Sequence, residues 1–217
     1  GMAEKIDFDG LRELSLKLAG KPPFTAENIY VDLLLTSAVE EIQGEFGFAL
    51  KGGTAIVKSW HAPYRFSYDL DFSLFGSKNP RKEYRKYQAE LEKLVSRLGF
   101  LIENPESDRH REGGRILILK LTDAPGHLRI PIKVSVSAID AEPCIAPVVR
   151  DFRLLAEIPG KFGRIYPEAV GQVAGKKAVV LAFDELCAEK IRAMATRGAG
   201  TEWSLLLRDV VDLRMME

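Results

Sequence analysis

The sequence is poor in cysteine and histidine and has no apolar run long enough to cross a membrane. It has 2 cysteines and 3 histidines among 217 residues. Cys144 and Cys187 have no zinc-binding spacing and cannot form a disulfide framework, so a reduced, cytoplasmic protein is expected. Because no stretch of about 20 apolar residues occurs, we predict neither a membrane-spanning helix nor a membrane partner.

Net charge is also absent, since 31 basic residues balance 31 acidic ones. This balance argues against non-specific binding of nucleic acid as the main function, although local basic patches are compatible with it. Hydrophobic residues make up 46% of the chain and charged residues 29%, which are ordinary globular values. A chain of 217 residues is long enough to bury a core in one or two domains.

The most informative stretch begins with Gly52-Gly53-Thr54, which lies between an apolar run and a short helical run that ends near Trp60. Two glycines let the backbone come close to a ligand. The helix that follows them directs its free N–H groups and the positive end of its dipole toward that ligand. The pattern therefore predicts a turn that binds phosphate.

A Ser-x-Asp-x-Asp segment follows, and its alternation predicts a strand. Ser67, Asp69 and Asp71 would share one face of this strand, because successive side chains point to opposite faces. Tyr68, Leu70 and Phe72 would pack on the other face. Carboxylates roughly 7 Å apart along a strand can hold one divalent cation, or two cations ~3.5–4 Å apart.

Either motif alone is weak, because most Gly-Gly pairs are turns and most Asp-x-Asp copies bind nothing. Their order, with Arg65 between them, favours a common site. Arg65 would lie on the face of Ser67, where it suits a phosphate oxygen or the carboxylates; a structural salt bridge to Asp69 is the alternative. His61 is expected in a loop, exposed to solvent, and contact with the substrate is the alternative.

The spacing of apolar and capping residues predicts the framework around this site. Helices are expected over 8–18 with Asp9 as cap, from Thr25 through Ile42, over 80–98 between Asn79 and Gly99, after Asp184 as cap, and over 203–216. Strands are expected over 46–50 and 100–103, with an antiparallel pair over 115–121 and 128–138. Residues 140–175 have an irregular, Pro- and Gly-rich pattern, and an apolar run follows over 178–182.

Basic residues crowd the first two turns of the helix expected over 80–98: Lys78, Arg81, Lys82, Arg85 and Lys86. Such a run is usually a solvated helix face. A patch that binds RNA phosphates beside the site is the alternative.

Lys51-Gly-Gly-Thr54, followed by Arg65-Phe-Ser-Tyr-Asp-Leu-Asp-Phe72, resembles the signature of the nucleotidyltransferase AbiEii/AbiGii toxin family. That family belongs to the polymerase-β-like nucleotidyltransferase superfamily. Glu185-Leu-x-x-Glu-Lys190-Ile-Arg-Ala resembles its second block, in which a lysine reaches the triphosphate. Arg208-Asp209-Val-Val-Asp212-Leu resembles its final block, in which an acid faces the active site. The alternatives are a solvated Lys190 and a salt-bridge network, in which Arg208 pairs with Asp212.

The resemblance implies an α+β, polymerase-β-like nucleotidyltransferase fold, with a mixed or antiparallel sheet flanked by helices and a C-terminal helical segment. Residues 1–150 would form the catalytic domain with its N-terminal helices. Residues 151–217 would form a linker and the C-terminal helical segment.

One strand departs from the family pattern. Polymerase-β-like enzymes usually supply a third carboxylate from an apolar-Lys-apolar-acid strand, but here the pattern is Ile132-Lys133-Val134-Ser135. Ser135 would stand in the position of the acid, and Asp140 could replace it only if the register shifted. One cation of a two-metal site would then lose an anionic ligand. The alternative to an enzyme is therefore a nucleotide-binding module that has lost turnover.

The function implied by the resemblance is metal-dependent transfer of NMP from an NTP to RNA, tRNA included, or to a protein. The protein would be the toxin of a toxin–antitoxin or abortive-infection system, with a cognate antitoxin as partner. The expected catalytic residues are Ser67, Asp69, Asp71 and Lys190, with Asp69 and Asp71 also binding Mg²⁺ or Mn²⁺. The expected nucleotide- and phosphate-binding residues are Lys51, Gly52, Gly53, Thr54, Arg65, Lys133, Asp209 and Asp212.

Overall fold

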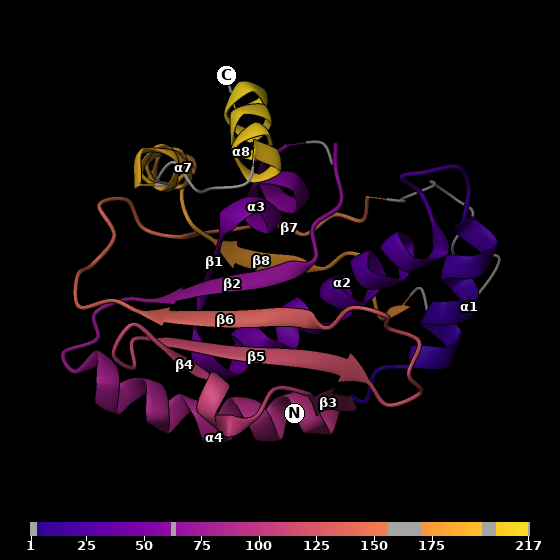
Figure 1. Cartoon of the computed structure of the whole chain (residues 1–217), viewed down its shortest axis with the longest axis horizontal. Helices are drawn as coiled ribbons and strands as arrows, with labels where there is room; N and C mark the ends of the chain where they lie inside the picture. The colour runs from indigo at the N-terminus through magenta and orange to yellow at the C-terminus, as the bar shows by residue number, and fades with distance from the viewer. Residues whose placement is uncertain (1–3, 62–63, 156–170, 197–202, 217) are drawn as a thin grey trace.

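A mixed sheet with helices packed against it organises the computed structural model, which describes residues 4–61, 64–155, 171–196 and 203–216 (Figure 1). The strands are β1 (Ala49–Lys51), β2 (Asp69–Leu74), β3 (Phe100–Ile102), β4 (His110–Arg111), β5 (Ile116–Asp123), β6 (Ile132–Ala138), β7 (Val148–Asp151) and β8 (Lys177–Val180). Their order across the sheet is β3-β5-β6-β2-β1-β8-β7, with β4 paired to β5.

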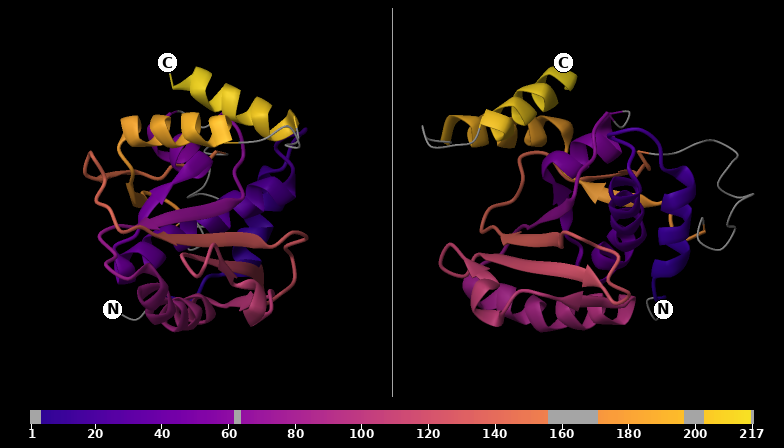
Figure 2. Two further views of the ribbon diagram at one scale, coloured as in Figure 1. Left: turned by 60° about the vertical axis from the view of Figure 1, so that its left-hand side comes forward. Right: turned by 45° about the vertical axis from the view of Figure 1, so that its right-hand side comes forward.

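The helices are α1 (Phe8–Leu18), α2 (Ala26–Phe46), α3 (Gly52–Ala55), η1 (Ile56–Trp60), α4 (Pro80–Leu98), η2 (Glu106–Asp108), α7 (Phe183–Thr196) and α8 (Trp203–Met215). Helices α2 and α4 pack on one face of the sheet, with α1 against α2 (Figure 2). Helices α7 and α8 lie beside α3 at the opposite end of the molecule from α4. No helix among the described residues is long and apolar enough to cross a bilayer.

Strand β2 lies at the centre of the sheet, and its neighbours are fixed in register. It pairs antiparallel with β1, so that Asp71 faces Lys51. It pairs parallel with β6, which places Asp69 opposite Lys133 and Asp71 opposite Ser135. The polar residues predicted to form the site therefore lie in one row across neighbouring strands.

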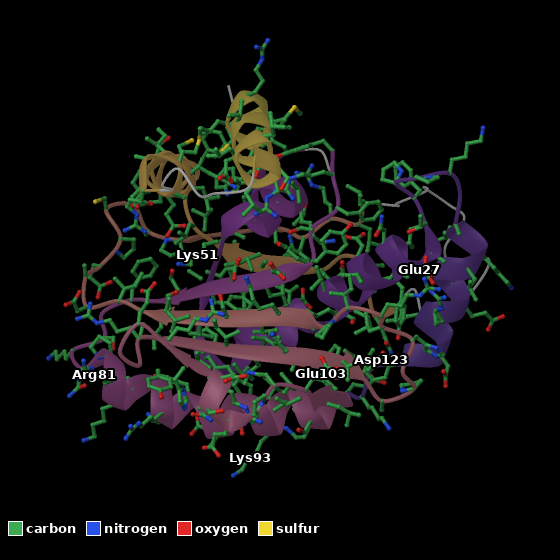
Figure 3. All side chains as sticks on the ribbon, viewed as in Figure 1. Glu27, Lys51, Arg81, Lys93, Glu103 and Asp123 are labelled. Atoms are coloured by element: carbon green, nitrogen blue, oxygen red, sulfur yellow. The ribbon has the colours of Figure 1, made fainter. Side chains whose placement is uncertain are left out.

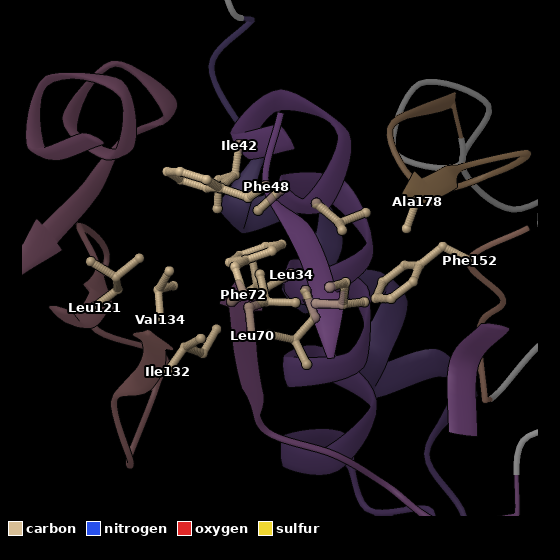
Figure 4. Packing of buried hydrophobic residues seen from close by; sticks show 14 of the residues in the cluster. Leu34, Ile42, Phe48, Leu70, Phe72, Leu121, Ile132, Val134, Phe152 and Ala178 are labelled. Atoms are coloured by element: carbon tan, nitrogen blue, oxygen red, sulfur yellow. The ribbon is translucent and has the colours of Figure 1, made fainter. Parts of the chain in front are cut away.

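The core between the sheet and α2 holds β2 in place. Leu34 of α2 and Leu70 and Phe72 of β2 are buried, and Figure 4 shows them in one cluster with Phe48 and Val134. Burying a side chain of this size contributes about 1.5–3 kcal/mol. Because Leu70 and Phe72 point into this core, alternation along the strand turns Asp69 and Asp71 to the opposite face.

Several predicted helix ends are confirmed. The Thr25 side chain accepts a hydrogen bond from the Asn28 N–H at 3.3 Å, as a cap of α2. Asn79 caps α4 by accepting from the Lys82 N–H at 3.2 Å, and Gly99 ends that helix with a φ of 99°.

The predicted cap of α1 was wrong, because Asp7 rather than Asp9 accepts the Gly10 N–H, at 2.9 Å. Gly10 is suited to this cap, since a Cβ there would collide with the Asp7 carboxylate. Asp184 is likewise not a cap, because α7 begins one residue earlier, at Phe183.

The strand boundaries differ from the prediction for identifiable reasons. Strand β1 starts at Ala49, since α2 continues to Phe46 and ends at Gly47, whose φ is 64°. Strand β6 starts at Ile132, because the Asp123 carboxylate accepts the N–H groups of His127 and Leu128 at 2.9 and 2.8 Å and folds this segment into a turn.

Strands also form within 140–180, where an irregular segment and an apolar run were expected. Strand β7 pairs antiparallel with β8, and β8 pairs parallel with β1. Lys177–Val180 therefore belongs to the same sheet as the row of site residues. The division into a catalytic domain over 1–150 and a linker with helices over 151–217 stays a prediction.

The α+β class, with a mixed sheet flanked by helices and C-terminal helices, is confirmed. One packing expectation was wrong. Tyr68 does not join the core face, because β2 begins only at Asp69; its side chain is exposed and its hydroxyl donates to Asn28 Oδ1 at 3.1 Å.

Candidate active site

The glycine turn and the aspartate strand meet directly. Gly52 has a φ of +72°, and a Cβ there would lie 3.3 Å from Asp71 Oδ2. Glycine tolerates this backbone conformation, whereas other residues are strained by it. A side chain at position 52 would also crowd the Asp71 carboxylate. The structure therefore brings together the two motifs that the sequence analysis assigned to one site.

Asp69 and Asp71 share one face and keep contact with solvent, since their side chains are 42% and 31% exposed. The Lys133 ammonium of β6 lies 3.3 Å from Asp69 Oδ2 and 3.8 Å from Asp71 Oδ1. Lys133 thus offsets the charge of both carboxylates. Lys133 was predicted to bind phosphate, and the structure shows these carboxylates as its partners.

Ser135 stands where the third carboxylate was expected. It lies opposite Asp71 in the parallel β2–β6 pair, and its hydroxyl donates to Asp71 Oδ1 at 2.5 Å. Asp140 is exposed and lies beyond the end of β6, so it does not replace the missing acid. Ser135 orients Asp71 but adds no negative charge.

The donor set fits one hard cation better than two. Mg²⁺ commonly binds through one or two carboxylates and completes its shell with water and substrate phosphates. Asp69 and Asp71 provide two such ligands beside a turn suited to phosphate. Among the described residues, no cluster of three or more His, Cys, Asp or Glu could hold a metal ion.

Thr54 connects the glycine turn to the start of β2. Its side chain is buried, and its hydroxyl donates to the Asp69 carbonyl at 2.5 Å. The Ser67 hydroxyl lies 2.5 Å from Thr54 Oγ1 and is placed to donate to it. Because these hydroxyls already have protein partners, they fix the spacing between turn and strand. Contact of Thr54 or Ser67 with a substrate phosphate stays a prediction.

Arg65 lies against the glycine turn, since a Cβ on Gly53 would collide with its guanidinium. The alternative of a salt bridge to Asp69 was wrong. The partner is Asp212 of α8, bound through Nε at 2.8 Å and Nη2 at 2.7 Å. The Arg65 side chain is still 20% exposed. A fork of this kind suits planar carboxylate groups and explains the choice of arginine.

The two later sequence blocks contribute Lys190, Asp209 and Asp212, which form a charged cluster with Arg65. Lys190 of α7 donates to Asp209 at 2.7 Å and lies 2.8 Å from Asp212, which also accepts from the Tyr64 hydroxyl at 2.7 Å. The alternative of a solvated Lys190 was therefore wrong. Asp212 pairs with Arg65 and Lys190 rather than with Arg208. We call the set Arg65, Lys190, Asp209 and Asp212 the buried ionic corner.

The electrostatics of this corner follow from burial and pairing. Burial alone would raise the pKa of Asp212, but hydrogen bonds from Arg65, Lys190 and Tyr64 outweigh it and lower that pKa to about 2. Burial lowers the pKa of Lys190, and its bond to Asp212 opposes the shift. Asp209 and Asp212 are fully buried anions. They therefore hold the cations of the corner and are not suited to contact phosphate themselves.

A cavity of about 380 Å³ opens beside Asp71 on the free face of the sheet. It is lined by Lys51, Gly52, Asp71, Arg111, Glu112, Ile116, Ile118, Lys120, Lys133, Ser135, Ser137 and Glu189. Lys51 lies 3.4 Å from Ser137 Oγ and 3.7 Å from Glu189 Oε1. Sequence reasoning missed Lys120, Arg111 and Glu189. The alternation of β5 could have revealed Lys120, which faces Lys133 across the β5–β6 pair.

A buried ion pair anchors the helix that follows the glycine turn. Lys58 of η1 is 1% exposed and pairs with Asp32 of α2, whose other oxygen accepts the Leu155 N–H at 2.8 Å. Nothing in the sequence around Lys58 separates it from a surface lysine. His61 is half-buried rather than solvent-exposed, with its ring against Phe183. Burial lowers its pKa, and the charges of Arg153 and Arg150 add to this shift.

Residues 34–217 match the model of the family described as nucleotidyl transferase AbiEii toxin, type IV toxin–antitoxin system. This match places the chain in a class of nucleotidyltransferase toxins. The chain belongs to the AbiEii toxin family, which confirms the predicted resemblance. No curated protein matches the chain.

The solved structures that match the chain are distant in sequence. JHP933 from Helicobacter pylori is 13% identical, with 78% of this chain and 56% of that chain covered and a TM-score of 0.39. A proposed nucleotidyltransferase from H. pylori is 14% identical, with coverages of 85% and 64% and a TM-score of 0.44. An antigenic nucleotidyltransferase-like protein from Paracoccidioides brasiliensis is 14% identical, with coverages of 88% and 75% and a TM-score of 0.39. The chain thus spans less than two thirds of either H. pylori protein.

Proposed function

We propose that this protein transfers an NMP group from an NTP to a hydroxyl group of RNA, and that it is the toxin of a toxin–antitoxin pair. The proposal depends mainly on one observation. The Asp71 carboxylate lies against the Gly52 turn, with Asp69 beside it on the same face. A triphosphate held by the turn would therefore bring its phosphates to the carboxylates that hold a cation.

Separate residues would bind the phosphates, hold the metal ion and position these groups. The backbone N–H groups at Gly52 and Gly53 would bind the β- and γ-phosphates, because they open a helix that continues through η1. Asp69 and Asp71 would hold Mg²⁺ or Mn²⁺, which would offset charge on the phosphate oxygens. Thr54 keeps turn and strand in register, and Ser135 keeps Asp71 oriented.

Cations at the turn would stabilise the charge that builds up during transfer. The acceptor hydroxyl oxygen forms a bond to the α-phosphorus and releases its proton to water, while the bond to the bridging oxygen breaks and pyrophosphate leaves with the electron pair. Arg65 lies over Gly53 and keeps 20% of its side chain exposed, so it can reach this leaving group. Lys190, at 10% exposure, is the second cation of this corner.

The proposal is tested with α-labelled nucleotides, total cellular RNA and Mg²⁺. The variant Asp69→Asn with Asp71→Asn should lose Mg²⁺-dependent labelling of RNA, because it removes both anionic cation ligands. Asp151→Asn is the matched control, since Asp151 is exposed on β7 and pairs with Lys177. Transfer that is equal in the double variant and the wild type would refute the assignment.

A second candidate is a nucleotide-binding module on the same fold that has lost turnover. The observation that favours it is the Ser135 hydroxyl in place of the third carboxylate. Titration calorimetry with GTP and Mg²⁺, run beside the labelling assay, separates the two functions. Binding without transfer to RNA or to protein would favour the module, and transfer would exclude it. Labelled protein in place of RNA would identify a protein acceptor, as in AMPylation.

A further inference from the structure

Exposed basic side chains gather where the start of α4 meets the tip of the β4–β5 hairpin. We call this set the basic ridge: Lys78, Arg81, Lys82, Arg85, Lys86, Arg111 and Arg115. All of these side chains are exposed, and within the described part of the chain none of them takes part in a salt bridge. Glu83 and Glu112 lie among them, so cations outnumber carboxylates on this surface.

The position of these cations opposes the preference of the helix. The first turn of a helix favours acidic residues, because its free N–H groups carry partial positive charge. Arg81 and Lys82 nevertheless occupy the first turn of α4 together with Glu83, and Arg85 and Lys86 follow in the second turn. The charges of these cations add to the positive potential of the helix N-terminus. The surface therefore attracts anions more strongly than the same number of scattered lysines would.

The ridge leads into the candidate active site. The Arg81 guanidinium packs on Gly113 of the hairpin, where a Cβ would lie 3.1 Å away. The Tyr84 ring contacts His110 with ring centroids 4.9 Å apart, which fixes helix and hairpin together. Arg111 of the same hairpin lines the cavity that contains Asp71 and Ser135. An extended polyanion on the ridge could therefore reach the carboxylates of the candidate site by way of Arg111.

We propose that the basic ridge is the docking surface for the phosphate backbone of the RNA acceptor. This inference depends on the proposed function and deepens it, since it assigns a surface of this chain to the RNA acceptor. The partner is argued from charge complementarity: the cations are exposed, spread over a helix and a hairpin, and form no salt bridge to a carboxylate of the described residues. Evenly spaced phosphates match this arrangement, and binding to them does not depend on sequence.

The test compares charge reversals on one helix. Arg81→Glu with Arg85→Glu changes the ridge, and Lys93→Glu with Arg97→Glu makes the same change of charge toward the other end of α4. Figure 3 shows Arg81 and Lys93 on separate parts of this helix. Lys93 and Arg97 lie among Glu45, Glu90 and Glu92, outside the ridge. The probe is fluorescein-labelled bulk tRNA, and its anisotropy is measured as a function of salt concentration.

We expect the ridge variant to bind tRNA roughly ten-fold or more weakly, with the slope of log affinity against log salt reduced by about 0.7–0.9 for each phosphate that the variant no longer neutralises. The tRNA affinity of the control should stay within about two-fold of wild type, because salt screens charges that lie outside the interface. Arg111→Glu with Arg115→Glu should reproduce the weaker binding from the hairpin side, which guards against a local defect in α4. Equal binding by the ridge variant and the control would overturn the proposal, as would labelling of protein without binding of RNA.

The outcomes also separate this inference from the proposed function. If the ridge variant loses tRNA binding but keeps Mg²⁺-dependent binding of NTP, the ridge is supported. If RNA is labelled equally by the ridge variant and the control, the ridge fails and the nucleotidyltransferase proposal stands. If tRNA binds through the ridge while the wild type labels nothing, the ridge stands and the transferase proposal fails.

Discussion

Two regions of the molecule combine acidic and basic side chains, and burial gives them opposite character. On β2 and β6, the Lys133 ammonium lies 3.3 Å from Asp69 and 3.8 Å from Asp71, and all three side chains stay about a third exposed or more. In the buried ionic corner, Lys190 and Asp212 approach to 2.8 Å with almost no exposure. In the first set, a bound metal ion and its phosphates could replace Lys133 as the partner of the two carboxylates. The second set fixes α7 and α8 beside the glycine turn.

The comparison shows that an ion pair near a site is not by itself a ligand site. Partly exposed charges keep their hydration and can be displaced at small cost, since such pairs contribute about 0–1 kcal/mol. Buried charges cannot lose their partners without a large penalty. The first region would therefore supply the cation ligands, whereas the carboxylates of the second fix α7 and α8 and hold Arg65 and Lys190 beside the glycine turn. Substitutions of the carboxylates should separate the two.

The largest effect is expected from Asp212→Ala, which leaves Arg65 and Lys190 in the corner without this carboxylate. Removing one partner of a buried ion pair costs about 3–5 kcal/mol. Urea denaturation should show this loss, and limited proteolysis should show release of α8. Asp151→Ala, which breaks an exposed pair with Lys177, is the control and should cost less than about 1 kcal/mol. Equal unfolding free energies for the two variants would contradict the architectural role.

A smaller effect is expected from acid. The pKa of Asp212 is about 2 in the folded state, below its reference of 3.8. The contribution of Asp212 to the free energy of unfolding is therefore fully present above pH 3.8 and is lost as the pH falls through about 2. The contribution should be about 1–2 kcal/mol after allowance for solvent screening. Wild type and Asp212→Asn should differ in the pH dependence of denaturant midpoints only in this acid range. If the denaturant midpoints of the two proteins had the same pH dependence at every pH, the low pKa of Asp212 would not contribute to stability.

Gly52→Ala should lower the free energy of unfolding by about as much as acid does. It should also weaken nucleotide binding at the candidate site. A left-handed backbone costs a non-glycine residue about 1–2 kcal/mol. Gly126→Ala is the matched control, since its φ is +77° and no atom lies within 4 Å of the added Cβ. Both variants should lose similar unfolding free energy. Only Gly52→Ala, which crowds Asp71, should lose Mg²⁺-dependent binding of NTP, and loss in both would point to a general defect.

The smallest effect on stability is expected from Asp69→Asn with Asp71→Asn. These side chains are partly exposed, so the unfolding free energy should change by less than about 1 kcal/mol. Thermal and urea denaturation provide the measurement. A loss as large as that of Asp212→Ala would mean that the pair belongs to the architecture rather than to the chemistry.

The part of the site that lies close together in sequence could be predicted, because short-range patterns determine it. Alternation placed Asp69 and Asp71 on one face. Ser135 is 64 residues from Asp71, and only the family resemblance gave it the position of the third carboxylate. Tyr68 was misplaced because alternation does not show where a strand begins. Strand β7 was missed because Val148–Asp151 lies in a Pro- and Gly-rich segment without a clear period.

Long-range partners could not be predicted. Arg65 and Asp212 are 147 residues apart, and Lys58 and Asp32 are 26 apart on different helices. Nothing local distinguishes a lysine that will be buried against an aspartate from one that will be solvated. These pairs depend on how α7, α8 and α2 pack, which the residue types at single positions do not encode.

The most direct measurement is a crystal structure with Mn²⁺ and a non-hydrolysable NTP analogue. We expect an anomalous peak between the carboxylates of Asp69 and Asp71, with the terminal phosphates at the N–H groups of Gly52 and Gly53. Manganese bound elsewhere, or a triphosphate that avoids the glycine turn, would contradict the claim that strand and turn serve a single nucleotide.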